Sequence, residues 1–235
     1  MPESENSYAD RLQRGRELQA ATAGFLPAFA PADADLIPAT FDAFLDGLDT
    51  LNTAVTDAAA DWMDDVVKRT AKVTEIKARA LRASSRVKSN AAWKMNLPAV
   101  KTAADNLRGY RTPPPKAPED APAPKTRLKG DQSYADIKGL TDKLVAALKK
   151  VPAYDTGTPA DISIAGMMAI ATQLDGLNQL VAGQEQALAA FRAPRKAGYD
   201  DAAGLKEKML AVKEAAKSQY GSQSPEFLQI KGIRV

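Results

Sequence analysis

The side chains with the clearest potential for chemistry are five basic residues in the first half of the chain. They are separated by steps of four, seven, three and four residues, which places them on one face of a helix: Lys68, Lys72, Arg79, Arg82 and Arg86. Ammonium and guanidinium groups in such a row can bind phosphate. One interpretation is therefore nucleic-acid or other polyanion binding through the basic segment 68–111.

The same segment belongs to an uneven charge distribution. Residues 1–65 hold 13 acidic side chains against three arginines, whereas residues 66–111 hold 12 basic side chains against two acidic ones. The interpretation that we favour pairs the basic face with an antiparallel acidic helix carrying Asp42, Asp46, Asp49, Asp57 and Asp64. Exposed ion pairs contribute only ~0–1 kcal/mol each, so this match would select the pairing more than stabilise it.

Other catalytic or metal-binding chemistry is hard to place. Asp61, Asp64 and Asp65 lie within about one helical turn and could hold Mg²⁺, but Trp62 and Met63 are expected on the core side, which turns the carboxylates to solvent. The chain has no histidine and no cysteine, so the commonest general base, zinc ligand and thiol nucleophile are absent. We expect a protein that is not an enzyme, with no metal, cofactor or small-molecule substrate.

The elements that would position these residues are helices, and their pattern occurs twice. Ser7-Tyr8-Ala9-Asp10 recurs 126 residues later as Ser133-Tyr134-Ala135-Asp136, and Leu48-Asp49-Thr50-Leu51-Asn52 recurs at the same offset as Leu174-Asp175-Gly176-Leu177-Asn178. In both halves, residues around the second match are spaced alternately by three and four, as in a heptad repeat. They would form one mostly apolar stripe along a helix, which we name the seam. The first seam is Phe41, Phe44, Leu48, Leu51, Val55, Ala58 and Trp62; the second is Met167, Ile170, Leu174, Leu177, Val181, Gln184 and Leu188.

Each half is predicted to contain three helices and a tail. The helices are expected at 7–24, 34–67 and 70–92 in the first half, and at 133–150, 159–192 and 200–219 in the second. Because the first half has no break near residues 67–70, its second and third helices could run on with only a kink. Ser7 and Ser133 are expected N-caps, Thr158-Pro159-Ala160-Asp161 an expected helix start, and Gly221 an expected C-cap. The run Ala193–Gly198, with its proline, is expected to break the chain, and Ser224-Pro225-Glu226 to begin a short final turn.

The sequence therefore predicts an all-α protein made by tandem duplication of a three-helix unit. The two units would pack as two small bundles or as one pseudo-symmetric six-helix bundle. Residues 1–111 would form the first repeat and residues 132–235 the second. Residues 112–131, with six prolines, would form an extended spacer between them.

The end of the chain carries a resemblance. Tyr220-Gly221 is followed by Ser224, Glu226, Phe227, Ile230 and Gly232, and this tail resembles the ending of uncharacterised bacterial all-helical proteins. The resemblance covers about 13 residues and implies a bacterial origin, but no activity and no site residues.

Function is predicted only as a class. Long seamed helices without a catalytic constellation favour a structural or protein-interaction role, with a protein partner or self-association. The acidic N-terminus lacks a secretory pattern, and no uncharged stretch is apolar and long enough to span a bilayer, so we expect a cytoplasmic protein without a membrane partner.

Overall fold

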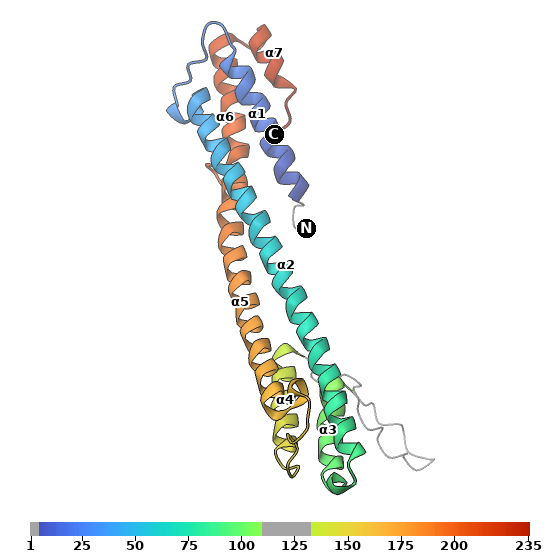
Figure 1. Cartoon of the computed structure of the whole chain (residues 1–235). Helices are drawn as coiled ribbons and strands as arrows, with labels where there is room; N and C mark the ends of the chain where they lie inside the picture. The colour runs from blue at the N-terminus through green and yellow to red at the C-terminus, as the bar shows by residue number, and fades with distance from the viewer. Residues whose placement is uncertain (1–4, 110–132) are drawn as a thin grey trace, which may run out of the picture. The chain divides into compact units, whose positions relative to one another are not determined.

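A computed structural model describes residues 5–109 and 133–235, and in these ranges every regular secondary-structure element is a helix. The chain is all-α, as predicted. Figure 1 traces α2 and α5 as long continuous helices. The elements are α1 (Glu5–Ala23), η1 (Ala34–Leu36), α2 (Pro38–Ser89), η2 (Ala91–Trp93), α3 (Leu97–Arg108), α4 (Tyr134–Leu148), η3 (Ala160–Ile162), α5 (Ile164–Asp200), α6 (Leu205–Tyr220) and α7 (Pro225–Lys231).

The chain divides into two compact units, and each draws on both halves of the sequence. Unit 1 consists of residues 1–62 and 184–235, and unit 2 of residues 63–183. Each unit therefore contains one part of α2 and one part of α5. The predicted spacer, residues 112–131, lies outside the described residues.

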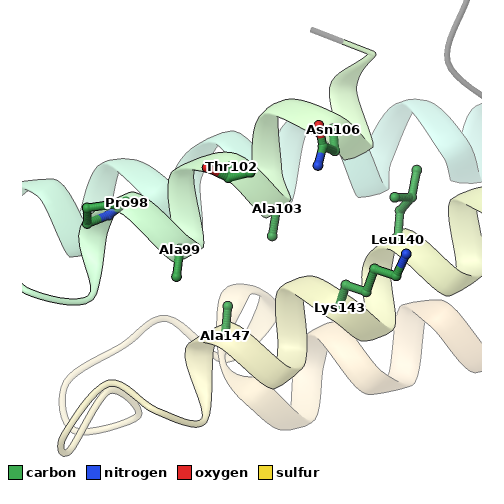
Figure 2. A pocket seen from close by; sticks show the side chains of 8 residues that line it. All are labelled: Pro98, Ala99, Thr102, Ala103, Asn106, Leu140, Lys143 and Ala147. Atoms are coloured by element: carbon green, nitrogen blue, oxygen red, sulfur yellow. The ribbon is translucent and has the colours of Figure 1, made fainter. Parts of the chain in front are cut away.

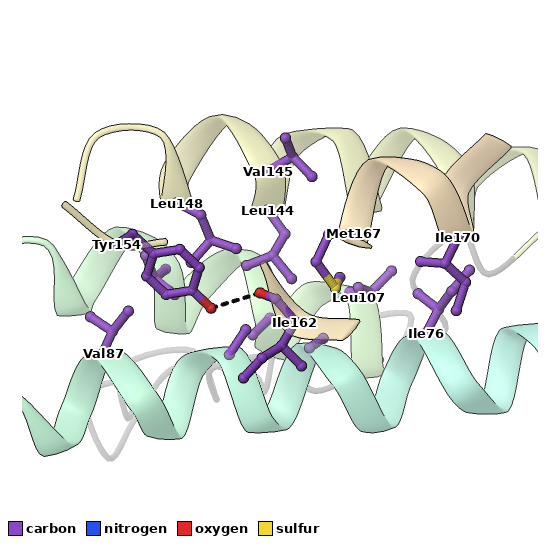
Figure 3. Close-up of a cluster of buried hydrophobic side chains, with 14 of the residues drawn as sticks. Ile76, Val87, Leu107, Leu144, Val145, Leu148, Tyr154, Ile162, Met167 and Ile170 are labelled. Carbon is purple, nitrogen blue, oxygen red and sulfur yellow. Dashed lines mark hydrogen bonds between the residues drawn. The ribbon is translucent and has the colours of Figure 1, made fainter. Parts of the chain in front are cut away.

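The core of unit 2 is formed by α2, α3, α4 and the start of α5. Fully buried residues of α2 meet leucines and isoleucines of the other helices (Figure 3). The Tyr154 hydroxyl donates a hydrogen bond of 3.0 Å to the carbonyl oxygen of Ile162 in this core. This bond connects the loop after α4 to η3. It stabilises that contact, because a buried hydroxyl without a partner is costly. The α2 residues of this core are Ile76, Ala80, Ala83 and Val87.

The core of unit 1 is formed by α1, the start of α2, the end of α5 and α6. Phe41, Leu45 and Leu18 are fully buried there. Gly15 of α1 makes the close approach possible, because a Cβ at this position would lie 2.8 Å from a terminal carbon of Leu45.

Equivalent elements and buried positions recur at the offset found in the sequence. Both η1 and η3, and the starts of α2 and α5, are separated by 126 residues. The seam positions Phe41 and Met167 are both fully buried, and Leu51 and Leu177 are both half-buried. At the drifted offset of 129, α2 and α6 bury matching positions: Ile76 and Leu205, Ala80 and Met209, Ala83 and Val212, Val87 and Ala216.

Two cation–π pairs join the halves in the same way. The guanidinium of Arg195 lies 4.4 Å from the ring centroid of Tyr8 in unit 1, and that of Arg69 lies 3.7 Å from the ring of Tyr134 in unit 2. Both the arginines and the tyrosines are 126 residues apart. In each pair the tyrosine comes from one half of the sequence and the arginine from the other.

Several predicted helix ends are confirmed. Ser133 and Asp136 form a reciprocal capping box at the start of α4. Ser224 caps α7 by accepting a hydrogen bond from the Phe227 amide, and Gly221, at φ 95°, ends α6.

Other predicted boundaries are wrong because tertiary packing outweighs local signals. α5 runs through Pro194 to Asp200 instead of breaking at residues 193–198. Arg195 and Tyr199 are buried on the core side, and a Cβ at Gly198 would lie 2.5 Å from Leu48. This packing compensates for the hydrogen bond that the proline cannot donate.

Two more helix starts also differ from the prediction. α1 begins at Glu5, so Ser7 lies inside the helix rather than at its N-cap. α5 begins at Ile164, after η3, and its cap is Ser163, whose hydroxyl accepts from the Gly166 amide at 3.0 Å. Thr158 instead donates to the carbonyl oxygen of Tyr154.

The second and third predicted helices of the first half form the single helix α2, without a break near residue 67. Residues 97–108, expected as a tail, form α3.

Candidate functional site

The five basic residues predicted as a polyanion site all lie on α2, and each has a partner inside the protein. Lys68 forms ion pairs with Asp64 at 2.6 Å and Asp65 at 3.2 Å, and the hydrogen bond to Asp64 is the main cause of a raised Lys68 pKa. Lys72 pairs with Glu75 at 2.8 Å, which lowers the pKa of that carboxyl group. The N-terminal end of the predicted face is thus neutralised by carboxylates of the same helix.

The three arginines bind the segment before α5. Arg79 donates from Nη1 to the carbonyl oxygen of Asp161 at 2.8 Å, and Arg82 pairs with the Asp161 carboxylate. The hydrogen bond from Arg82 lowers the pKa of Asp161. Arg86 donates from Nη2 to the carbonyl oxygen of Thr156 at 2.9 Å and from Nε to the hydroxyl of Thr158. The arginine face therefore anchors the connection between α4 and α5.

The favoured pairing with an antiparallel acidic helix is wrong. Asp42, Asp46, Asp49, Asp57 and Asp64 lie on α2 itself, N-terminal to the basic residues, so they cannot face the basic residues as a second helix of the same chain. Asp46 and Asp49 instead pair with Arg16 of α1, at 3.5 and 2.8 Å.

The acidic cluster around Trp62 is divided among other contacts. Asp64 and Asp65 both pair with Lys68, and Asp61 is exposed. Met63 is 64% exposed rather than on the core side as expected, and Trp62 is half-buried. Within the described ranges, no three carboxylates gather as a set of metal ligands.

A groove of about 400 Å³ between the end of α2 and α3 collects basic residues that the sequence pattern did not single out. We name it the basic groove. Its polar lining is Ser84, Ser85 and Lys88 of α2 with Lys101, Asp105 and Arg108 of α3, and its apolar lining is Leu81, Leu97 and Ala104.

Asp105 pairs with two of the three cations of the basic groove. Lys101 lies 2.6 Å and Arg108 4.0 Å from oxygens of Asp105. Lys88 has no ion pair or hydrogen bond within the described part of the chain, and the same holds for the hydroxyls of Ser84 and Ser85. The groove thus carries three cations against one acid, with two hydroxyl donors beside them.

α2 also presents an apolar face to solvent, opposite its buried one. Met63 and Val67 are 64% and 65% exposed, and Leu81 is 45% exposed. We name the stripe they share the exposed ridge. It runs over about 27 Å, since each helical residue rises 1.5 Å, and consists of Met63, Val67, Ala71, Thr74, Ala78 and Leu81.

A second groove, of about 420 Å³, lies between α3 and α4. Figure 2 shows Ala99 and Ala103 of α3 opposite Ala147 and Leu140 of α4, with the Lys143 side chain along one wall. Small side chains on both helices leave this space open. It contains a single charged group, so it offers less chemistry than the basic groove.

Comparison of the chain with protein-family models, curated proteins and solved structures finds no match. Among the described residues, no helix combines the length and the apolar character needed to cross a bilayer.

The basic groove was not predicted from the sequence because its residues come from two helices, α2 and α3, whose packing the sequence pattern did not indicate. A local signal was present. Lys101 and Arg108 lie seven residues apart, on one face of a helix, and Gly109 marks the end of that helix at φ 84°.

Proposed function

We propose that this protein is a non-enzymatic interaction module that binds a partner helix along the exposed ridge of α2. The observation that carries the proposal is the exposure of Met63 and Val67 on the same face as Leu81. Scattered exposed apolar residues are ordinary, but a continuous stripe with steps of three and four matches the anchors of a helix–helix contact.

The charge of α2 defines the partner. Between residues 63 and 89 this helix carries eight basic residues and three acidic ones. A second copy would bring the same excess of positive charge to the contact. We therefore propose a partner of opposite charge, an amphipathic helix with apolar residues every three or four positions and acidic residues beside them.

The absence of cysteine from the chain allows a site-specific test of this ridge. Val67→Cys carrying a photo-crosslinker should capture the partner, whereas Met95→Cys, at a position that is 91% exposed but off the ridge, should not. With the purified partner, Met63→Glu combined with Val67→Glu should weaken binding at least tenfold, since it adds negative charge and removes two anchors. Met95→Glu is the control.

Light scattering complements this test. The proposal predicts a monomer that forms a heteromeric complex with its partner. A strict monomer that retains no partner contradicts the interaction role, and a stable dimer through the ridge contradicts the acidic partner in favour of a second copy.

We further propose that the two halves are copies of one helical unit, repeated in tandem as the sequence indicates. The common offset of η1 and η3, the matched buried positions and the two Tyr–Arg pairs support this. Because each compact unit contains segments of both halves, we propose that the copies exchange their C-terminal parts rather than fold as separate domains. Fragment complementation, with the two halves produced as separate chains, tests this.

The proposal keeps a cytoplasmic location and a bacterial source, as the sequence suggests. Fractionation of a native host with an antibody against the chain tests the location. Support for the alternative function, polyanion binding, lies within the predicted segment 68–111 but at residues other than the five on the basic face.

A further inference from the structure

We propose that the basic groove between α2 and α3 is a binding site for a small phosphate-bearing anion. The inference does not depend on the exposed ridge or on a protein partner. It sharpens the alternative of polyanion binding by naming other residues and a compact ligand.

The first support is the distribution of neutralised and free charge. The five basic residues of the predicted face are engaged with Asp64, Asp65, Glu75, Asp161 and carbonyl oxygens of the α4–α5 connection. Two residues beyond Arg86 on α2, Lys88 is exposed and forms no ion pair within the described ranges. The basic groove therefore holds a lysine whose charge is not neutralised within the described ranges, beside two further cations.

The second support is the combination of donors. Lys88 and Lys101 provide compact ammonium charges, and Arg108 provides a planar guanidinium that can bind two phosphate oxygens at once. Ser84 and Ser85 add hydroxyl donors. These groups line one groove of about 400 Å³, which is large enough for a phosphate ester but too small for a long polymer to lie within it.

Asp105 explains how the site is kept ready without a ligand. Its carboxylate lies 2.6 Å from Lys101 and 4.0 Å from Arg108, so it holds both cations at the groove while neutralising only one charge. A phosphate would bind Lys88, which has no ion pair within the described ranges, and would share Lys101 and Arg108 with Asp105. Because these side chains are already positioned, less conformational entropy is lost when the anion binds.

The experiment is isothermal titration of the full-length chain with inorganic pyrophosphate, repeated with a single-stranded oligonucleotide. We expect pyrophosphate to bind at one site and to weaken as salt rises. The double variant Lys88→Gln, Lys101→Gln should reduce the affinity for pyrophosphate tenfold or more. A loss of this size corresponds roughly to the free energy of one hydrogen bond to a charged group. Lys149→Gln with Lys206→Gln, two exposed lysines outside the groove, should leave it unchanged.

A charge-removal pair separates the site from general electrostatics. Asp105→Asn should strengthen pyrophosphate binding, because removing a negative charge from the groove outweighs the loss of the contacts that position Lys101 and Arg108. Asp142→Asn removes an exposed carboxylate that pairs with Lys138 on α4, and it should have no such effect. Circular dichroism confirms that each variant is folded.

The proposal is overturned if pyrophosphate does not bind at low salt, or if the Lys88/Lys101 pair can be replaced without loss. Tight oligonucleotide binding without pyrophosphate binding also overturns it, in favour of an extended polyanion surface. Loss of partner binding in the ridge variants leaves this result untouched, so the two proposals fail separately.

Discussion

Replacing Gly166 with alanine tests how closely α5 packs on the η3 turn. A Cβ at Gly166 would lie 2.0 Å from the carbonyl oxygen of Ala160 and 3.0 Å from backbone atoms of Asp161. Contacts under 3.0 Å are essentially never seen for Cβ atoms, so the turn would have to move by about 1 Å. These neighbours are backbone atoms and cannot rotate away.

The expected magnitude follows from the contacts that this movement disturbs. Arg79 donates to the carbonyl oxygens of Asp161, at 2.8 Å, and of Gly166, at 3.4 Å. Losing a hydrogen bond from a charged donor costs about 1.5–3 kcal/mol. The better helix propensity of alanine offsets about 0.5–1 kcal/mol. We therefore expect Gly166→Ala to lower the free energy of unfolding by about 1–2 kcal/mol.

The assay is urea denaturation followed by circular dichroism. Gly176→Ala is the matched control in the same helix, because no atom lies within 4 Å of its added Cβ. This control should raise the free energy of unfolding by about 0.5–1 kcal/mol, and with it the urea midpoint. If Gly166→Ala is as stable as the parent chain or more stable, the packing argument is refuted.

Three further predictions concern the helices and the core. Pro194→Ala should stabilise the protein by about 1–3 kcal/mol in thermal unfolding, because the side chain is exposed and alanine restores a helical hydrogen bond. Burial raises the pKa of Tyr154 to about 12. Between about pH 10 and 12 the unfolded chain therefore loses this proton while the folded chain keeps it. The free energy of unfolding should fall by about 2–3 kcal/mol as pH rises through that window. Ile76→Ala and Leu205→Ala, at equivalent and almost fully buried positions, should each cost about 2–5 kcal/mol in urea unfolding.

Each of these has a control and a contradicting result. Ala193→Gly beside the proline should destabilise, and a Pro194→Ala variant that melts lower would show that the proline is packed in a way its exposure does not indicate. Tyr154→Phe should reduce the alkaline dependence, leaving the part due to Tyr199, whose pKa burial also raises. A parent chain with the same profile as this variant contradicts the assignment. A large effect at Ile76 with none at Leu205 would contradict their equivalence.

The seam and the caps were predictable because their signals are local. Apolar steps of three and four placed Phe41 and Met167 in the cores. Ser133 with Asp136, and Ser224 before a proline, satisfy helix-end amides by themselves. Such signals need no knowledge of the partner helices.

The remaining features depend on contacts between distant residues. The continuation of α5 past Pro194 rests on buried Arg195 and Tyr199, which no local rule reveals. The partner of the basic face was assigned to the wrong carboxylates because Asp161, which pairs with Arg82, lies 79 residues away from it. A charge pattern on one helix predicts which face is charged, but only the fold determines what that face meets.

Separating the chain at the predicted spacer tests the proposed exchange of segments between the two copies most directly. Residues 1–111 and 132–235 would be produced as separate chains, alone and together, and examined by light scattering and chemical denaturation. Because each compact unit takes helices from both halves, we predict a one-to-one complex with the helical content of the intact chain, and no cooperatively folded monomer from either half alone. Two halves that each unfold cooperatively as isolated monomers, and do not associate, would contradict it.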